Sequence, residues 1–297
     1  MAISNQFGLS CALALPLTDS FDIDFDRLVA HAHRCLASGC SSVTLFGTTG
    51  EGASISLAER EQVLAALSET GIRMDQVVGG VTSSSVGDAV AQARLVLERG
   101  CRTILLAPPF YFKDITDEGL YNWFSRFCEK LDDDRIEVIL YHIPSATAAP
   151  LSVGLISRLQ ASFPKTIKGV KDSGSAWSYT EALLKLHKDL AILIGNEGHL
   201  AAAVRLGASG AISGLANLLP EMLLGIIETG RDDNRIITLA TEILRFPFTP
   251  ALKVLLAYRD NDPAWATPRP PLARLSKSEE ASLLLIYDRV RSEPAPV

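Results

Sequence analysis

Hydrophobic positions along the chain gather in short runs, many of them rich in β-branched residues, and longer amphipathic stretches separate these runs. Near-continuous apolar runs of this length are typical of strands buried on both faces of a parallel sheet, whereas half-exposed strands alternate apolar and polar positions. The pattern predicts eight such strands. They are residues 11–15, 42–46, 76–81, 103–107, 137–141, 166–171, 191–195 and 209–213.

The stretches between these runs predict helices. Residues 24–39, 56–71 and 85–100 are each amphipathic and end at a glycine, where a helix C-terminus is expected. Strand and helix alternating eight times predict a (β/α)8 TIM barrel. A doubly wound sheet is the other candidate, but it has fewer strands and a glycine fingerprint after the first strand, which residues 11–24 lack.

The chain continues well beyond the eighth predicted strand. Residues 219–230 and further segments out to residue 290 predict additional helices, interrupted by a proline-rich stretch at 262–275. We therefore expect two parts, a barrel over residues 1–220 and a C-terminal helical extension over residues 221–297.

Composition and charge narrow the classes of partner. The chain has 297 residues, of which 47% are hydrophobic, and a net charge of −6, with lysines and arginines dispersed and outnumbered by acids. This balance argues against a nucleic-acid partner. No run is long and apolar enough to span a bilayer, and residues 9–17 are interpreted as a first strand rather than a signal peptide, so no membrane partner is expected.

The five cysteines contain no CxxC pair of the kind that binds metal. A disulfide framework is not expected in a chain of this length. We expect free thiols and a cytoplasmic location.

In TIM-barrel enzymes the catalytic residues lie at the carboxyl ends of the strands. The residues at these ends of the predicted strands therefore form one set of candidate site residues. The set contains a lysine, two phenols and a hydroxyl-rich glycine loop, without a cluster of metal ligands. Its members are residues 47–51, 108–111, 141, 171–172, 195–197 and 213–214.

Lys171 is the candidate nucleophile of this set. It ends a predicted inward-facing strand, where an amine kept neutral by its surroundings would form a Schiff base with a ketone. The alternative is a lysine that pairs with Asp172 or extends into solvent. The glycine loop beside Thr48 and Thr49 offers amide and hydroxyl donors for a carboxylate or phosphate oxygen, although a plain turn would have the same pattern.

The two phenols, Tyr141 and Tyr111, are candidate acid–base groups, and each could instead be a packed aromatic. A phenol aligned with a hydroxyl such as that of Thr48 would move protons. Lysine, carboxylate-binding loop and phenol together favour one kind of substrate, because a single ketoacid would use all three.

Four segments resemble the signatures of one family, the pyruvate-dependent class I lyases that include dihydrodipicolinate synthase and N-acetylneuraminate lyase. They are GTTGEG at 47–52, YHIP at 141–144, GVKDS at 169–173 and GASGAISGLAN at 207–217. The resemblance extends over essentially the whole chain. It implies a TIM barrel with a C-terminal helical extension, a tetramer built from tight dimers, and no metal or organic cofactor.

The resemblance also assigns the ketoacid end of the site. It makes Lys171 the Schiff-base residue for pyruvate or another 2-ketoacid. Thr48 and Thr49 would bind the carboxylate, and Ile212 matches a backbone position beside that carboxylate pocket.

The resemblance assigns the proton-transfer groups as well. Tyr141 would be the acid–base phenol, exchanging protons between the substrate and Thr48. Tyr111 matches a phenol that enters the site of the neighbouring subunit and completes the relay.

The loop after the fifth strand departs from the pattern of dihydrodipicolinate synthases. Those enzymes have an arginine that binds the carboxylate of aspartate semialdehyde, and here that position is Ala146, which cannot form a bidentate pair. The loop is more similar to that of 2-keto-3-deoxy sugar-acid aldolases, so Ser145 and Thr147 are expected to face a polyol. The sequence therefore favours an aldolase or lyase that acts on a 2-keto-3-deoxy sugar acid, with pyruvate as one partner. The alternatives to this activity are a dihydrodipicolinate synthase that condenses pyruvate with aspartate semialdehyde, and a keto-deoxy acid dehydratase.

Two other classes of function are considered. A metal-dependent amidohydrolase is suggested by His31 and His33, with His142 at a strand end, but the first pair lies in an amphipathic stretch where residues two apart point to different faces. A non-catalytic ketoacid sensor would need only the threonine loop and the imine.

Overall fold

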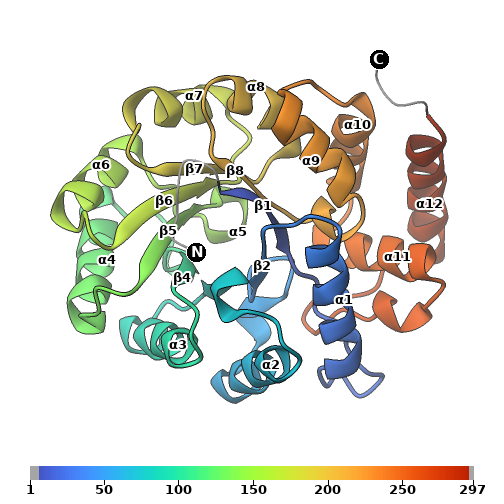
Figure 1. Cartoon of the computed structure of the whole chain (residues 1–297), viewed down its shortest axis with the longest axis horizontal. Helices are drawn as coiled ribbons and strands as arrows, with labels where there is room; N and C mark the ends of the chain where they lie inside the picture. Colours follow the sequence, from blue (N-terminus) through green and yellow to red (C-terminus); the bar gives the residue numbers. More distant parts are fainter. Residues whose placement is uncertain (1–6, 294–297) are drawn as a thin grey trace.

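The computed structural model describes residues 7–293 and contains a closed barrel of eight parallel strands in chain order, with β8 paired to β1. The predicted TIM barrel is therefore confirmed (Figure 1). The strands are β1 (Gly8–Ala12), β2 (Ser42–Leu45), β3 (Val77–Val81), β4 (Thr103–Leu106), β5 (Glu137–His142), β6 (Ile167–Asp172), β7 (Ala191–Ile194) and β8 (Gly210–Ser213).

Helices surround the barrel and continue after it. The ring consists of α1 (Phe25–Ala37), α2 (Leu57–Glu69), α3 (Val86–Glu98), α4 (Asp117–Leu131), α6 (Val153–Ser162), α7 (Trp177–Leu186), α8 (Leu200–Arg205) and α9 (Pro220–Thr229). A single helical turn, α5 (Pro144–Thr147), follows β5. The chain then forms α10 (Asn234–Ile243), α11 (Phe248–Asp260) and α12 (Lys277–Ser292).

The predicted ends of the first three helices agree with the structure. Gly39, Gly71 and Gly100 follow α1, α2 and α3 with φ angles of +97°, +82° and +90°. These angles lie in the left-handed region, which glycine adopts without a steric penalty. At the other end of α2, the Ser56 side chain accepts a hydrogen bond from the Glu59 amide. The Glu59 carboxylate in turn accepts one from the Ser56 amide, which completes a capping box.

The first strand lies three residues earlier than the hydrophobic pattern predicts, at 8–12 instead of 11–15. The chain stays extended past this point, and the Leu13 amide still bonds to β2. The amide of Ala14, however, donates to the side chain of Asn217 at 2.9 Å. Asn217 lies in the turn after β8, so this turn replaces a strand as the partner and ends the ladder.

The core has two layers. One cluster fills the inside of the barrel with side chains from the strands, among them Val78, Leu105, Ile139, Leu193 and Ile212. The other, larger cluster lies between the strands and the helices. Because successive strand residues alternate between these layers, the register of each strand decides which side chains reach the barrel mouth.

The C-terminal helices lie to one side of the barrel. Figure 1 shows α10, α11 and α12 gathered beside α1 and α9. Since α9 packs against both β1 and α8, it occupies the place of the eighth helix of the ring. We propose that the boundary between barrel and extension falls between α9 and α10, rather than at residue 220. Residues 1–6 and 294–297 of the two expected parts lie outside the described residues.

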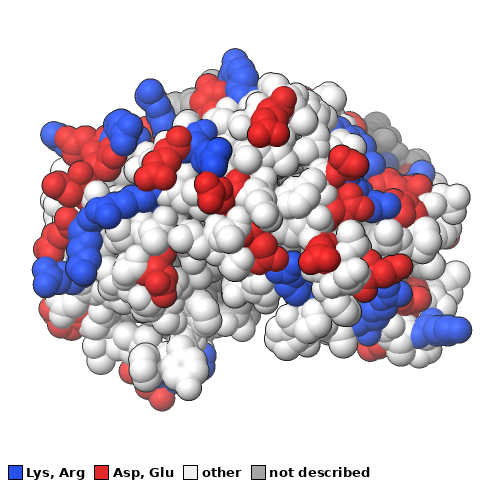
Figure 2. All heavy atoms as spheres, turned by 90° about the horizontal axis from the view of Figure 1, so that it is seen from below, with Lys and Arg blue, Asp and Glu red and all other residues white. Residues whose placement is uncertain are grey.

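Acidic and basic side chains are interspersed on the face shown in Figure 2. All five cysteines are buried and free. Within residues 7–293, no helix has the length and hydropathy needed to cross a membrane.

Candidate active site

Lys171 and Tyr141 lie side by side on neighbouring strands. They are register partners in the β5–β6 ladder, and both point into the barrel, where Tyr141 belongs to the inner cluster. The Lys171 ammonium donates a hydrogen bond to the Tyr141 hydroxyl, with 3.2 Å between Nζ and the phenol oxygen. Only 5% of Lys171 is exposed. The amine therefore lies in the mouth of the barrel instead of extending into solvent.

Thr48 extends this contact into a chain of three side chains. Its Oγ1 lies 3.4 Å from the Tyr141 hydroxyl. Burial acts to raise the pKa of Tyr141, but the Lys171 ammonium and hydrogen bonds with Thr48, Lys171 and Ser173 oppose it, and the pKa lies below its ordinary value. The phenol thus has a partner on each side and a pKa moved toward the working range of an acid–base group.

The loop that carries the threonines is tightly folded. Phe46 and Glu51 have φ angles of +57° and +53°, in the left-handed region that non-glycine residues rarely adopt. A Cβ at position 52 would stand 1.8 Å from the Phe46 carbonyl oxygen, so only glycine fits there. The buried guanidinium of Arg60 donates to the carbonyl oxygens of Gly52 and Gly80 at 2.7 and 2.6 Å and lies over the Phe46 ring.

The loop meets the end of β8 at Gly214. A Cβ there would stand 3.2 Å from Thr49 Oγ1 and 2.5 Å from the Phe248 ring, so glycine is required for the close approach. Ile212, two residues earlier, is completely buried in the inner cluster. The structure thus brings Thr49 and the end of β8 together.

Space for the lysine side chain depends on Gly195, which follows β7. A Cβ at this position would lie 2.1 Å from Ser173 Oγ and 2.9 Å from Lys171 Cε. Both separations are too short for real contacts. A side chain at 195 would therefore displace the amine.

Glu197 and Ser213 belong to the mouth, and our sequence interpretation gave neither a role. The Ser213 hydroxyl donates to the Glu197 carboxylate. Burial raises the pKa of the Glu197 carboxyl, although the Ser213 hydrogen bond and the charge of Lys171 oppose the shift. Both residues lie just after or at the end of a predicted strand, and this position could have marked them as site residues. Neither belongs to a recognised motif, however, so the sequence predicts no specific chemical role for either.

The loop after β5 is closed by its own hydrogen bonds. Thr147 is buried, and its hydroxyl donates to the Ile143 carbonyl oxygen at 3.0 Å and accepts from the Ala149 amide. Ser145 and Ala146 are exposed on the same turn. Of the two hydroxyl residues predicted to face a second substrate, Ser145 therefore has the exposed position, while the Thr147 hydroxyl is engaged with the backbone.

His142 supports this loop from outside the barrel. Its Nδ1 accepts a hydrogen bond from the Leu151 amide at 3.1 Å, and its ring stacks on Tyr179 with centroids 4.1 Å apart. The Tyr179 hydroxyl donates to the Leu151 carbonyl oxygen at 2.6 Å. Both polar backbone atoms of Leu151 are thus held where the loop ends.

Tyr111 lies apart from the other site residues. Its side chain is 74% exposed and packs edge-on against Phe112, which is 70% exposed. Within one copy of the chain, no hydrogen bond between described residues joins Tyr111 to Lys171 or Tyr141.

The histidines of the amidohydrolase alternative do not converge. His31 is buried on α1, where its Nε2 lies 2.8 Å from the Asn217 amide oxygen, whereas His33 is exposed. Among residues 7–293, no three His, Cys, Asp or Glu side chains are grouped as metal ligands would be.

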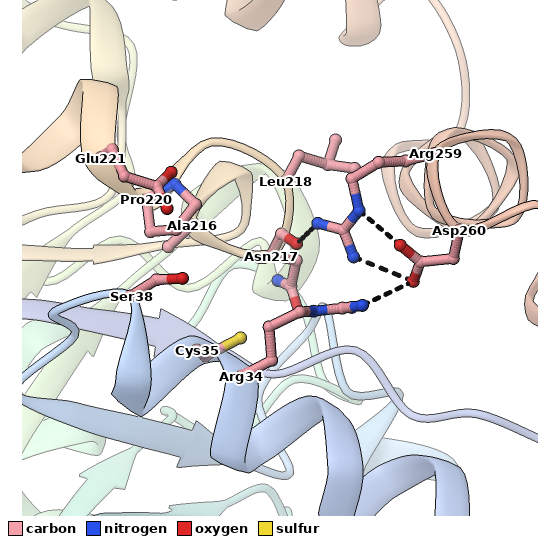
Figure 3. Close-up of a pocket in the computed structure, with 10 residues that line it drawn as sticks. All are labelled: Arg34, Cys35, Ser38, Ala216, Asn217, Leu218, Pro220, Glu221, Arg259 and Asp260. Carbon is pink, nitrogen blue, oxygen red and sulfur yellow. Dashed lines mark hydrogen bonds and ion pairs between the residues drawn. The ribbon is translucent and has the colours of Figure 1, made fainter.

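A separate pocket of about 250 Å³ lies between α1, the start of α9 and the end of α11 (Figure 3). The guanidinium groups of Arg34 and Arg259 both pair with Asp260, and Arg259 also donates to the Asn217 carbonyl oxygen. These contacts connect the extension to the barrel. Because both arginines are already paired with Asp260, we assign the pocket no ligand.

Comparison with known proteins agrees with this geometry. The model of the dihydrodipicolinate synthetase family matches residues 5–287. An uncharacterized DapA-like lyase from Chloroflexus aurantiacus is 30% identical over 97% of this chain and 98% of its own. Dihydrodipicolinate synthase from Agrobacterium tumefaciens is 46% identical, and its crystal structure matches with a TM-score of 0.93 over 96% of this chain and 99% of that chain.

A 2-keto-3-deoxygluconate aldolase from Sulfolobus, 22% identical over 96% of both chains with a TM-score of 0.84, has the same fold. The family model covers nearly all of the chain, as the resemblance in the sequence implies. The chain belongs to the dihydrodipicolinate synthetase family, whose members are pyruvate-dependent lyases and aldolases.

Proposed function

We propose that the protein is a Schiff-base lyase that cleaves or forms a 2-keto-3-deoxy sugar acid, with pyruvate as one partner. The observation that carries the proposal is the chain of contacts from Lys171 to Tyr141 to Thr48 in the barrel mouth. It supplies a nucleophilic amine, a phenol and a hydroxyl within reach of one small ketoacid.

In the cleavage direction, the neutral amine of Lys171 attacks the ketone carbon. The Tyr141 hydroxyl donates its proton to the departing hydroxyl, so loss of water gives a protonated imine and a Tyr141 phenolate. The Tyr141 phenolate then accepts the proton of the C4 hydroxyl while the C3–C4 bond breaks, and the bonding electrons move toward the imine nitrogen to give an enamine. The aldehyde leaves. Protonation of the enamine at C3 and hydrolysis then release pyruvate and the free amine.

Two features favour a polyol as the second fragment. Ala146 offers no charge for a second carboxylate. Glu197 and Ser213 add a carboxyl and a hydroxyl at the mouth, which suit the hydroxyl groups of a sugar acid and would repel an anionic aldehyde when Glu197 is ionised.

Reduction of the imine tests the reaction centre. With pyruvate and borohydride, we expect one stable adduct, located at Lys171 by peptide mass. Lys171→Met should abolish it, whereas Lys168→Met, on the outer side of the same strand, should keep it. No adduct, or an adduct at another lysine, would refute the proposed chemistry.

Dihydrodipicolinate synthase activity is the second candidate, favoured by the 46% identity to the Agrobacterium tumefaciens enzyme. Pyruvate release from a panel of keto-deoxy acids should be compared with condensation of pyruvate and aspartate semialdehyde. Efficient use of the semialdehyde would reverse our ranking, and loss of water without pyruvate release would identify a dehydratase.

We also propose that the site is completed by a second copy within a homotetramer built as a dimer of dimers. Two exposed aromatic rings on one loop, Tyr111 and Phe112, form an apolar surface suited to such a contact. Mixed oligomers of Tyr111→Phe and Lys171→Met subunits should regain activity relative to either variant alone. A fully active monomer would contradict the shared site.

A further inference from the structure

The carboxylate-binding loop is unusual in two respects, its backbone strain and its distant supports. Left-handed φ angles at Phe46 and Glu51 are unfavourable for non-glycine residues and persist only where the surroundings enforce them. Arg60, on α2 of the helical ring, provides one support through its hydrogen bond to the Gly52 carbonyl oxygen. The other supports come from α11 and the segment after it, about 200 residues later in the chain.

Two side chains on one face of α11 contact the loop. The Thr249 hydroxyl donates to the Thr48 carbonyl oxygen at 3.2 Å. One turn later, the Lys253 ammonium forms an ion pair with the Glu51 carboxylate. The side chains of Lys253 and Glu51 are only 0% and 1% exposed, so this pair is fully removed from water.

The remaining bonds of the ion pair are also provided by the extension. The Glu51 carboxylate accepts from the Arg269 amide, and the Lys253 ammonium donates to the Thr267 carbonyl oxygen at 2.8 Å. Burial lowers the pKa of Lys253, and Glu51 acts in the opposite direction. A buried pair with this many partners has a defined geometry, and loss of one partner leaves the other charge uncompensated.

We propose that the C-terminal extension shapes the carboxylate pocket, with Thr249 and Lys253 as positioning residues that hold the loop carrying Thr48 and Thr49. The proposal rests on the function proposed above. It predicts that these helix residues control how tightly pyruvate binds, although neither belongs to the chain of side chains around the amine.

The test measures the pyruvate concentration that gives half-maximal borohydride labelling, together with Tm. This readout needs no second substrate. Thr249→Val, which removes one hydrogen bond at constant shape, should raise the half-saturating concentration about 2- to 10-fold. Lys253→Met should raise it about 10-fold or more, since it leaves Glu51 unpaired.

Two further variants separate positioning from stability. Glu51→Gln combined with Lys253→Met removes both charges, so Tm should recover relative to Lys253→Met alone while pyruvate binding stays weak. Asp233→Asn weakens a different ion pair of the extension, with Arg235, and should lower Tm without changing pyruvate binding.

The outcomes distinguish the two proposals. If the wild-type protein forms no adduct with pyruvate, the proposed function is wrong, and the inference is lost with it. If the wild type is labelled but Thr249→Val and Lys253→Met keep its half-saturating concentration, the function stands. In that case Lys253 has only a structural role, and the inference is wrong.

Discussion

Replacing Gly195 with alanine tests whether the position of the Lys171 side chain limits imine formation. The added Cβ would stand 2.9 Å from Lys171 Cε and 2.1 Å from Ser173 Oγ. The serine hydroxyl can rotate away, but carbon atoms pack at about 3.5–4.0 Å, so Cε must withdraw by about 0.6 Å or more. The amine at the end of the side chain moves with it.

The expected loss follows from this displacement. A misplacement of about 1 Å in a reacting group costs about 10²-fold in rate, so the smaller shift at Lys171 should slow labelling by about 10- to 100-fold. Overpacking of this kind also costs about 1–3 kcal/mol of stability. Gly195→Ala should therefore remain folded, with a Tm lower by several degrees and a much slower reaction with pyruvate.

The assay is the initial rate of borohydride labelling at a fixed, subsaturating concentration of pyruvate. The matched control is Gly225→Ala, because Gly225 lies within α9 and a Cβ there would meet nothing within 4 Å. This control should label at the wild-type rate and gain up to about 1 kcal/mol from improved helix propensity. A folded Gly195→Ala protein that labels as fast as the wild type would show the reasoning to be wrong.

Three further predictions concern proton transfer, the second substrate and acid stability. Tyr141→Phe should still form the pyruvate adduct but slow deuterium exchange at the pyruvate methyl group about 10²- to 10⁴-fold. Because the pKa of Tyr141 is lowered, activity that needs the protonated phenol should fall, as pH rises, at a pH below about 10, and this limb should vanish in Tyr141→Phe. Glu197→Gln should change the KM for the second substrate and leave pyruvate labelling intact; altered labelling would contradict the separation of the two ends. The Arg235 hydrogen bond lowers the pKa of Asp233, so the stability that this pair contributes is present above the ordinary carboxyl pKa and lost as pH falls through the lowered one. The Tm difference between wild type and Asp233→Asn should accordingly shrink below about pH 4, and a constant difference would exclude this cause.

Much of the barrel was predictable because its signals are local. Apolar runs identify strands buried on both faces, and Gly39, Gly71 and Gly100 mark helix ends where left-handed backbone is needed. The first strand was misplaced because hydrophobicity does not show where a ladder ends. The end of this ladder is set by Asn217, whose side chain accepts the hydrogen bond of the Ala14 amide and lies more than 200 positions away in the sequence.

The geometry of the candidate site was predictable for the same local reason, as far as it depends on strand ends. Lys171 and Tyr141 meet because the parallel register makes them partners. The Glu51–Lys253 pair was not predictable, because nothing in a glycine loop or in an amphipathic helix indicates that two charges so far apart will be buried together. The exposed Tyr111 shows a different limit of prediction from one chain, since the partner proposed for it lies in another subunit.

The two loops of the mouth differ in how they would behave in recombination between relatives. The turn at 143–150 is closed by its own backbone and hydroxyl groups and ends on Leu151, so it could be exchanged as a short cassette to alter substrate range. The loop at 47–52 could not, because its partners lie in α11. A chimera that joins the first half of one relative to the last third of another would therefore have to carry matching residues at both 51 and 253.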